Sequence, residues 1–184
     1  MHVVLLQPSD APQYRDLMLE AYELAADAFT STAGERAAEP ASFWVKRIAD
    51  PSGLSAAFGA FEGKKLVGAV ALEFSAKPKT THKGLVIGMY TAPAAREKGV
   101  AHALLEAVVA HARAKNGLLT LTLTLTVTEG NEPAVSLYRS VGFQIFGLEP
   151  MAICTPSGFK GKVHMWLPLQ HSAVTPLKKL HLSC

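Results

Sequence analysis

Between residues 119 and 128 the sequence alternates without interruption between an apolar residue and threonine, "LTLTLTLTVT". Successive side chains of a β-strand point to opposite faces, so this period of two predicts a strand with one apolar and one polar face. The apolar face is expected to lie under a helix. The threonine face has two open interpretations: it looks inward at a polar ligand, or outward at water.

The remaining sequence divides into segments with helical and with extended patterns. Apolar residues recur every three or four positions in the helical segments, whereas the extended segments are short, apolar and bounded by turn residues. We expect helices over residues 11–29, 40–48, 100–116 and 132–141, and strands over residues 2–7, 55–61, 65–76, 83–92, 119–128, 144–154 and 162–169.

These elements follow the order βααβββαβαββ, which predicts a mixed α/β fold with a partly antiparallel sheet. Short turns between the strands of residues 55–92 predict an antiparallel meander. Residues 30–40 are expected to break the first helix, and residues 156–161 to form the turn between the last two strands. Asn116 and Gly117 are expected to cap the helix before them.

Length and composition limit the kind of protein this is. The 184 residues suffice for one well-buried domain, which we place at residues 2–169, with an unassigned tail at 170–184. The 18 Lys and Arg residues are spread along a chain of formal net charge +3 without a long basic block. A general nucleic-acid binder usually concentrates its basic residues, so no nucleic-acid partner is expected, and a local basic site for a phosphorylated ligand fits better.

Cysteine usage and hydropathy indicate the compartment. Cys154 and Cys184 stand thirty residues apart, with no metal-ligand or redox spacing near them, which predicts free thiols and no metal site. The apolar run at residues 3–6 has no charged leader and is too short for a signal peptide, and no window is long enough to cross a bilayer. We therefore expect a cytoplasmic protein without a membrane partner.

The segment "YTAPAAREKGVAHALLEAVV", residues 90–109, joins an expected strand to an expected helix through a glycine-bearing loop. The first N–H groups of a helix have no intrahelical acceptor, and the helix dipole adds positive potential there, which suits an anion such as phosphate. The loop lacks the Gly-Lys-Ser/Thr of a nucleotide P-loop and the glycine spacing of a dinucleotide-binding fold. By itself such a turn is common without any ligand.

Three segments in this order resemble the GNAT superfamily of acetyl-CoA-dependent N-acetyltransferases: a strand ending in "IGMYTAP", the loop "AREKGVA" opening a helix, and "TVTEGNEPAVSLYRSVGF" after the next strand. The match covers residues 85–146, and the element order extends the likeness to residues 2–169. The resemblance implies an α/β fold of the α+β type, with a mixed, largely antiparallel sheet flanked by helices. The motif positions are Arg96, Gly99, Ala101, Asn131, Leu137, Tyr138, Gly142 and Phe143.

The resemblance also implies a cofactor site. The pyrophosphate of coenzyme A would be received by backbone N–H groups from Arg96 to His102, with the charges of Arg96 and Lys98 nearby. Two positions depart from the family pattern, since Ala101 replaces the commoner glycine and Glu97 brings a carboxylate where relatives often have glycine. The implied cofactor-binding residues are Met89, Thr91, Arg96, Glu97, Lys98, Gly99, Val100, Ala101, His102 and Asn131.

In the family, the strand end before the loop pairs its backbone with the pantetheine arm, which here implies Met89 and Thr91. The N–H near Met89 would then face the thioester oxygen. Gly88 has two interpretations: it is the bulge that separates this strand from the next and admits the arm, or it is a packing glycine.

Tyr138 resembles the general acid of the family, which gives a proton to the departing thiolate; without the motif it would be interpreted as a packed aromatic residue. Many relatives carry a glutamate base where this chain has Thr126, whose hydroxyl cannot accept a proton at neutral pH. Glu73, His82 and Glu129 are the remaining nearby candidates, or an ordered water passes the proton to bulk solvent. No base is assigned.

Acceptor specificity in the family comes mainly from the first two helices and their connection, here residues 25–47. Acidic side chains in this region would attract a cationic amine, and aromatic ones would line its apolar part. A solvated acidic loop beside core aromatics explains the same residues. The acidic candidates are Asp27, Glu35 and Glu39, and the aromatic candidates are Phe29, Phe43 and Trp44.

Three functions remain to be compared. The first is an acetyltransferase that moves an acetyl group from acetyl-CoA to a primary amine of a small molecule, peptide or protein. The second is a non-catalytic acyl-CoA-binding sensor module, for which Thr126 and Glu97 leave room. The third is a basic domain that binds nucleic acid in a strongly salt-dependent way. Dimers are frequent among similar proteins, so the resemblance is compatible with a homodimer.

Overall fold

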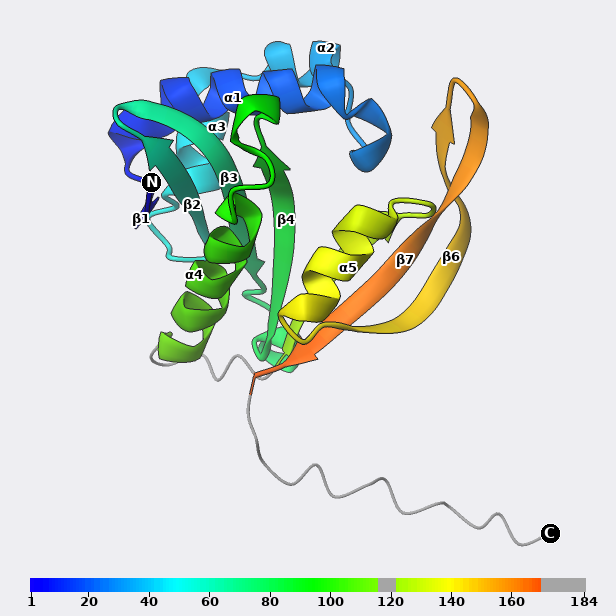
Figure 1. Ribbon diagram of the computed structural model, residues 1–184. Helices are drawn as coiled ribbons and strands as arrows, with labels where there is room; N and C mark the ends of the chain where they lie inside the picture. The colour runs from blue at the N-terminus through cyan, green and yellow to red at the C-terminus, as the bar shows by residue number, and fades with distance from the viewer. Residues whose placement is uncertain (116–121, 170–184) are drawn as a thin grey trace, which may run out of the picture.

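The computed structural model describes residues 1–115 and 122–169 of the chain. Their strands form one sheet in the order β1-β2-β3-β4-β5-β7-β6, with helices on both faces (Figure 1). Neighbouring strands are antiparallel except β4 and β5, which run parallel, so the predicted mixed, largely antiparallel sheet is confirmed. The strands are β1 His2–Leu5, β2 Ser55–Glu62, β3 Lys65–Phe74, β4 Lys83–Thr91, β5 Thr122–Thr128, β6 Gln144–Thr155 and β7 Gly158–Pro168.

The α-helices of the described residues are α1 Ala11–Leu24, α2 Ala33–Ala37, α3 Ala41–Ile48, α4 Val100–Ala114 and α5 Glu132–Ser140. Two predictions about this region were wrong. The first helix ends at Leu24, and a separate 3-10 turn follows at Ala26–Ala28. Residues 30–40, predicted as a break, contain α2, because Thr32 and Glu35 form a capping box in which each side chain accepts from the other residue's backbone N–H.

Two strand ends also differ from the prediction. The first strand stops at Leu5 because a 3-10 turn begins at Pro8. The last hairpin turns within two residues rather than over residues 156–161, since Thr155 already pairs with Gly158. Gly158 has a φ of 113°, a backbone conformation that glycine adopts without a steric penalty.

Each face of the sheet carries its own hydrophobic core. One core packs α1 and α3 against β2 and β3 and includes Tyr14, Met18 and Trp44. The other packs α4 and α5 against the opposite face, where Leu123, Leu125 and Val127 of β5 are buried. The predicted apolar face of the alternating strand therefore lies under helices, as expected. The meander β2-β3-β4 is antiparallel, as the short turns predicted.

A bulge interrupts the pairing of β4 with β3. Ala69 pairs with Tyr90 and Ala71 with Ile87, so Gly88 and Met89 together oppose the single residue between them on β3. Gly88 has a φ of 62°, and an added Cβ would meet its nearest neighbours at 3.6 Å, an ordinary contact. The backbone conformation, not packing, therefore requires glycine here, which confirms that Gly88 lies in a bulge.

Strands β4 and β5 separate along their length. Their parallel pairing extends only from Lys83 and Thr122 to Leu85 and Thr124, although both strands continue further. Gly88 and Met89 thus have no registered partner on β3 or on β5. The bulge and the separation together leave backbone groups of β4 available to a ligand between the two strands.

Some predictions lie outside the described residues: the helix cap at Asn116 and Gly117, the first part of the alternating strand at 119–121, and the tail 170–184. Within the described ranges, no helix combines the length and the apolar character that crossing a membrane requires.

Candidate active site

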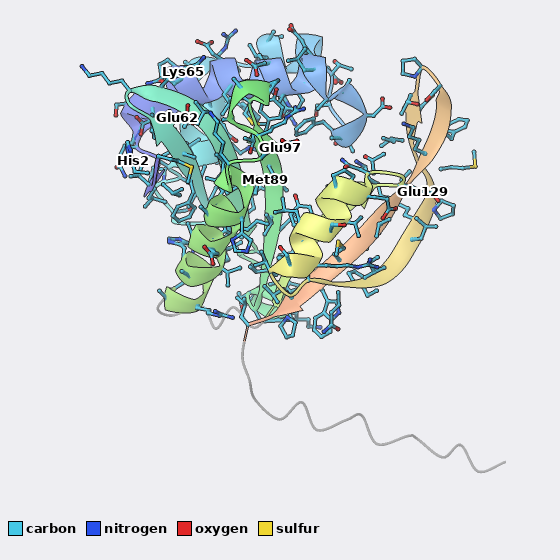
Figure 2. The ribbon with its side chains drawn as sticks, in the orientation of Figure 1. His2, Glu62, Lys65, Met89, Glu97 and Glu129 are labelled. Carbon is cyan, nitrogen blue, oxygen red and sulfur yellow. The ribbon has the colours of Figure 1, made fainter. Side chains whose placement is uncertain are left out.

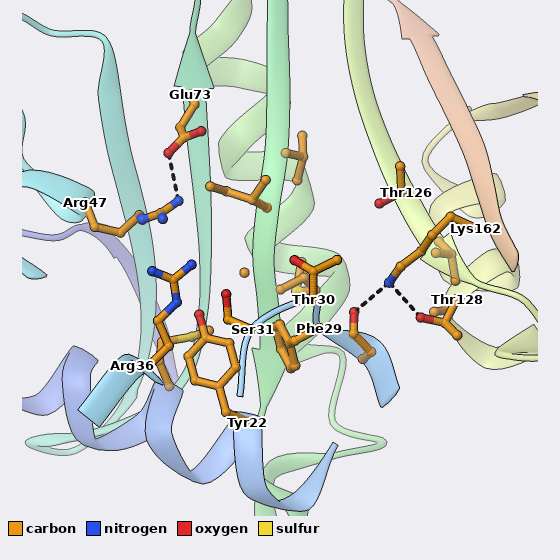
Figure 3. Close-up of a pocket in the computed structure, with 18 of the residues that line it drawn as sticks. Tyr22, Phe29, Thr30, Ser31, Arg36, Arg47, Glu73, Thr126, Thr128 and Lys162 are labelled. Atoms are coloured by element: carbon orange, nitrogen blue, oxygen red, sulfur yellow. Dashed lines mark hydrogen bonds and ion pairs between the residues drawn. The ribbon is translucent and has the colours of Figure 1, made fainter. Parts of the chain in front are cut away.

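A pocket of about 340 Å³ opens where β4 and β5 separate. Its walls come from β4 at residues 86–89, from β5 at residues 126–128, from α5, and from the segment that contains α1, α2 and α3. Figure 3 shows the arginine side chains on one side of β4 and Lys162 with the β5 threonines on the other. The threonine face of β5 therefore looks into a cavity at Thr126 and Thr128, which supports the inward interpretation.

A second cavity, of about 240 Å³, lies at the start of α4. Thr91, Ala95 and Leu137 line it together with six residues of the loop and the first helical turn: Arg96, Glu97, Gly99, Val100, Ala101 and His102. Leu137 lines both cavities, and Met89 and Thr91, two residues apart on β4, line one each. The two cavities therefore adjoin along β4 and α5.

The loop before α4 presents its backbone to this second cavity. Gly99 is the N-cap of α4 with a φ of 76°, and a Cβ added to it would meet no atom within 4 Å. The first N–H groups of α4 have no acceptor within the helix and add to its positive dipole end. Arg96 Nε donates to Thr91 O at 3.3 Å, which holds the arginine beside the strand end. Backbone donors and one guanidinium therefore face an open space of the kind that receives phosphate.

Lys98 and Glu97, two charged residues of the loop, differ in whether they line the second cavity. Lys98 does not line either cavity; its Nζ lies 3.3 Å from Glu62 Oε1 at the end of β2, where Figure 2 labels Glu62. Glu97 does line the second cavity and is exposed. Its φ is 61°, a conformation that glycine adopts more readily than glutamate.

Two further predicted cofactor residues make contacts of their own. His102 is half-exposed, and its Nδ1 lies 3.6 Å from Glu106 Oε2 one turn along α4. Asn131 is the N-cap of α5, and its Oδ1 accepts from Ala134 N at 3.2 Å while the residue lines the larger pocket. The cap explains Asn131 structurally, since it fixes the start of the helix that carries Tyr138.

Tyr138 is a buried tyrosine that lines the larger pocket. Its side chain is 7% exposed and packs edge-on against Phe143, with ring centroids 5.8 Å apart. No described residue forms a hydrogen bond with its hydroxyl. Burial raises the pKa of Tyr138 to about 12, so the phenol keeps its proton at neutral pH and can donate a hydrogen bond.

The candidate bases differ in whether they line the pocket and in the partners they have. Glu73 lines the pocket, but its Oε1 accepts from Arg47 Nη1 at 2.7 Å. Glu129 accepts from Gly161 N at 3.2 Å, and neither Glu129 nor His82 lines the pocket. Thr126 lines it but supplies only a hydroxyl. Among the three candidate bases, Glu73, His82 and Glu129, only Glu73 therefore brings a carboxylate to the cavity, and it is already paired.

The region expected to bind the acceptor divides into residues that reach the pocket and residues that do not. Phe29, Phe43 and Trp44 line it, and Trp44 is also part of a buried core. The three acidic residues are engaged elsewhere: Asp27 with Lys160 at 2.6 Å, Glu35 in the α2 cap, and Glu39 with Arg36 at 3.5 Å. None of the three lines the pocket, so the structure does not support the interpretation in which these acidic residues attract the amine.

Three basic residues that line the pocket were missed at the sequence level: Arg36, Arg47 and Lys162. Lys162 is 5% exposed, and its Nζ donates to Thr128 Oγ1 at 2.8 Å and to Ala28 O at 3.2 Å. Burial lowers the pKa of Lys162. Lys162 pairs with Thr128 between β7 and β5, and this pairing places it in the pocket. The sequence alone does not reveal the pairing.

A model of the acetyltransferase (GNAT) family matches residues 18–143, more than half of the chain. The chain belongs to the GNAT family of acetyltransferases. The match includes β4, the loop before α4, β5 and α5, which are the elements that build both cavities. No curated protein sequence matches the chain.

Solved structures share this GNAT fold over almost the whole chain. The yncA protein of Salmonella typhimurium, solved with its cofactor acetyl-CoA, is 16% identical, with a TM-score of 0.78 and coverage of 94% of this chain and 96% of its own. A ribosomal-protein-alanine N-acetyltransferase from Brucella melitensis is 18% identical (TM-score 0.76, coverage 91% and 99%). A GCN5-related N-acetyltransferase from Kribbella flavida is 23% identical (TM-score 0.75, coverage 91% and 96%). These similarities confirm the predicted fold, and the family match confirms the predicted class of enzyme.

Proposed function

We propose that this GNAT protein transfers an acetyl group from acetyl-CoA directly to a primary amine. The observation that carries the proposal is the adjacency of the two cavities: a helix start suited to phosphate lies at one end, and a pocket with a buried, protonated tyrosine lies at the other. Leu137 and Tyr138, consecutive on α5, connect them. This arrangement suits a ligand with a phosphate end and a reactive end.

The residues of the smaller cavity fit the phosphate groups of coenzyme A. The open space in front of Gly99, the unpaired N–H groups of the first turn of α4 and the Arg96 guanidinium would hold them. Gly88 and Met89, which lack a strand partner, would bind the arm of the cofactor through their backbone. When bound, acetyl-CoA supplies an acetyl group activated as a thioester.

The chain's own groups have two tasks in this reaction. The Tyr138 hydroxyl donates a hydrogen bond to the sulfur as negative charge develops there, and burial strengthens such a bond by excluding water. The acceptor amine must be neutral to attack, and its nitrogen loses one proton as it gains the acetyl group. The departing sulfur takes the proton of the Tyr138 hydroxyl and leaves as a thiol, and the phenolate regains a proton from solvent. With Glu73 paired to Arg47, water and the solvent take the amine proton.

Calorimetric titration of acetyl-CoA and of CoA into the purified protein tests the cofactor site first. Thiol release from acetyl-CoA is then measured against a panel of primary amines. Saturable one-site binding together with amine-dependent thiol release is the expected result. Binding without release from any amine would instead favour the non-catalytic sensor module, which Thr126 and Glu97 leave open, and absence of binding would contradict the cofactor site.

A further inference from the structure

The charges that line the larger pocket have the wrong sign for a purely cationic acceptor. Arg36, Arg47 and Lys162 face a single acidic residue, Glu73. A protonated amine entering this pocket would meet a net positive wall and would be repelled. An acceptor with a negative group elsewhere in the molecule would be attracted, because that group finds its counter-charges on the protein.

The two arginines lie near the same aromatic ring. The guanidinium carbons of Arg36 and Arg47 lie 4.9 and 5.4 Å from the centroid of the same Phe43 ring. Figure 3 shows both guanidinium groups on the same side of β4, with Arg47 turned towards Glu73. Two guanidinium groups on the same side of the pocket provide positive potential that favours an anion there.

The carboxylates of the protein pair only partly with these two arginines. Arg47 is paired with Glu73 at 2.7 Å, whereas Arg36 reaches Glu39 only at 3.5 Å and through Nη1 alone. Within the described part of the chain, the Nε of Arg36 is buried and has no hydrogen-bond partner. A buried donor without an acceptor is costly, and a guanidinium fork binds oxyanions through two parallel N–H groups.

We propose that the acceptor is a small primary amine that also carries an oxyanion, a carboxylate in the first instance, bound by Arg36 with Arg47. This inference rests on the proposed function, because it names the substrate class of that same site. The aromatic lining of Tyr22, Phe29, Phe43 and Trp44 accommodates an apolar body between the oxyanion and the amine. The acetyl group then forms an amide at the amine nitrogen while the oxyanion remains unchanged.

Matched pairs of acceptors test the charge requirement in the wild-type protein. L-phenylalanine and 4-aminobutyrate are compared with their primary amides, which keep the shape and lose the negative charge. The amine of L-phenylalaninamide is less basic than that of phenylalanine, so a poorer rate with the amide cannot be caused by protonation of its amine. A 3-aminopropylphosphonate sample tests whether a tetrahedral oxyanion replaces the planar carboxylate.

Two variants test the assigned side chain. Arg36→Gln removes the charge at similar length, and Arg36→Lys keeps the charge but removes the fork. Arg113→Gln is the matched control, because Arg113 is an exposed arginine of α4 that does not line the pocket. Thiol release gives kcat and KM for each acceptor, and calorimetry on the CoA-saturated protein gives acceptor binding without chemistry.

The expected result is a KM about 10- to 100-fold lower for at least one acid than for its amide, with Arg36→Gln abolishing that difference and Arg36→Lys restoring part of it. Arg113→Gln should behave as wild type. Equal use of acids and amides, or no saturable binding of any of the oxyanion-bearing amines to the CoA-saturated protein, would overturn the assignment. Failure of acetyl-CoA itself to bind would refute the proposed function instead, so the two failures are distinguishable.

Discussion

Glu97 and Gly99, two residues apart in the loop before α4, both have a left-handed backbone, with φ angles of 61° and 76°. Glycine adopts this conformation without a penalty, whereas a residue with a side chain loses about 1–2 kcal/mol. The same loop lines the cavity assigned to the coenzyme A phosphates. Glu97 therefore combines backbone strain with a carboxylate beside an anion site.

Glu97→Gly is expected to increase both the stability of the protein and its affinity for acetyl-CoA. Relief of strain, offset by the greater entropy of glycine in the unfolded chain, should raise the free energy of unfolding by about 0.5–1 kcal/mol. Loss of the exposed carboxylate should tighten acetyl-CoA binding about two- to fivefold at low salt. Denaturant unfolding and calorimetry measure the two effects. Glu97→Gln should reproduce the gain in affinity alone, and unchanged affinity in both variants would place the carboxylate away from the phosphates.

Gly99→Val is expected to weaken acetyl-CoA binding strongly. A β-branched residue in this conformation costs about 1–2 kcal/mol and fills the open space in front of the loop. Gly63→Val is the matched control, because Gly63 has a φ of 59° and equally open space but lies in the β2–β3 turn. Both variants should lose similar stability, while only Gly99→Val should lose affinity. Normal affinity in folded Gly99→Val would refute the assigned phosphate site.

Tyr138→Phe is expected to reduce kcat about 100-fold while changing the affinity for acetyl-CoA less than about twofold. The hydroxyl has no partner among the described residues, so removing it should leave stability nearly unchanged. Tyr90→Phe serves as the control: Tyr90 donates to Glu20 at 2.9 Å and lines neither cavity, so it should lose stability and keep its activity. Full turnover in Tyr138→Phe would exclude the acid role.

His111 should make the protein sensitive to acid. Burial, and secondarily the charge of Lys115, lowers the pKa of His111 below its ordinary value of 6.5. The unfolded chain then binds more protons than the folded one as the pH falls through 6.5, so stability decreases in that window. Denaturant unfolding between pH 8 and 5 measures how the free energy of unfolding depends on pH, and this dependence should be weaker in His111→Gln than in the wild type. Equal slopes would mean that His111 titrates alike in both states.

The alternation of residues 119–128 and the motif around Gly99 and Tyr138 were sufficient to predict the sheet, its helix-covered face and the family. These features depend on local periodicity and on residue types that a backbone conformation demands, and both are written in consecutive residues. Gly88 shows the limit of such reasoning. The sequence supported two interpretations of Gly88 equally, a bulge and a packing glycine. The register of Ala69 and Ala71 with β4 distinguishes them.

The chemistry of the acceptor pocket was decided by tertiary structure alone. Asp27, Glu35 and Glu39 are acidic residues of the right segment, yet none of them lines the cavity and each pairs with another residue of the protein. Arg36 and Arg47 reach it from the neighbouring helices α2 and α3, whereas Lys162 reaches it from β7, much further along the chain. The sequence of a segment shows which charged residues are available near a site. The net charge of the pocket, however, depends on which of these side chains point into it in the folded protein. No local pattern contains that information, because it arises from contacts between distant elements.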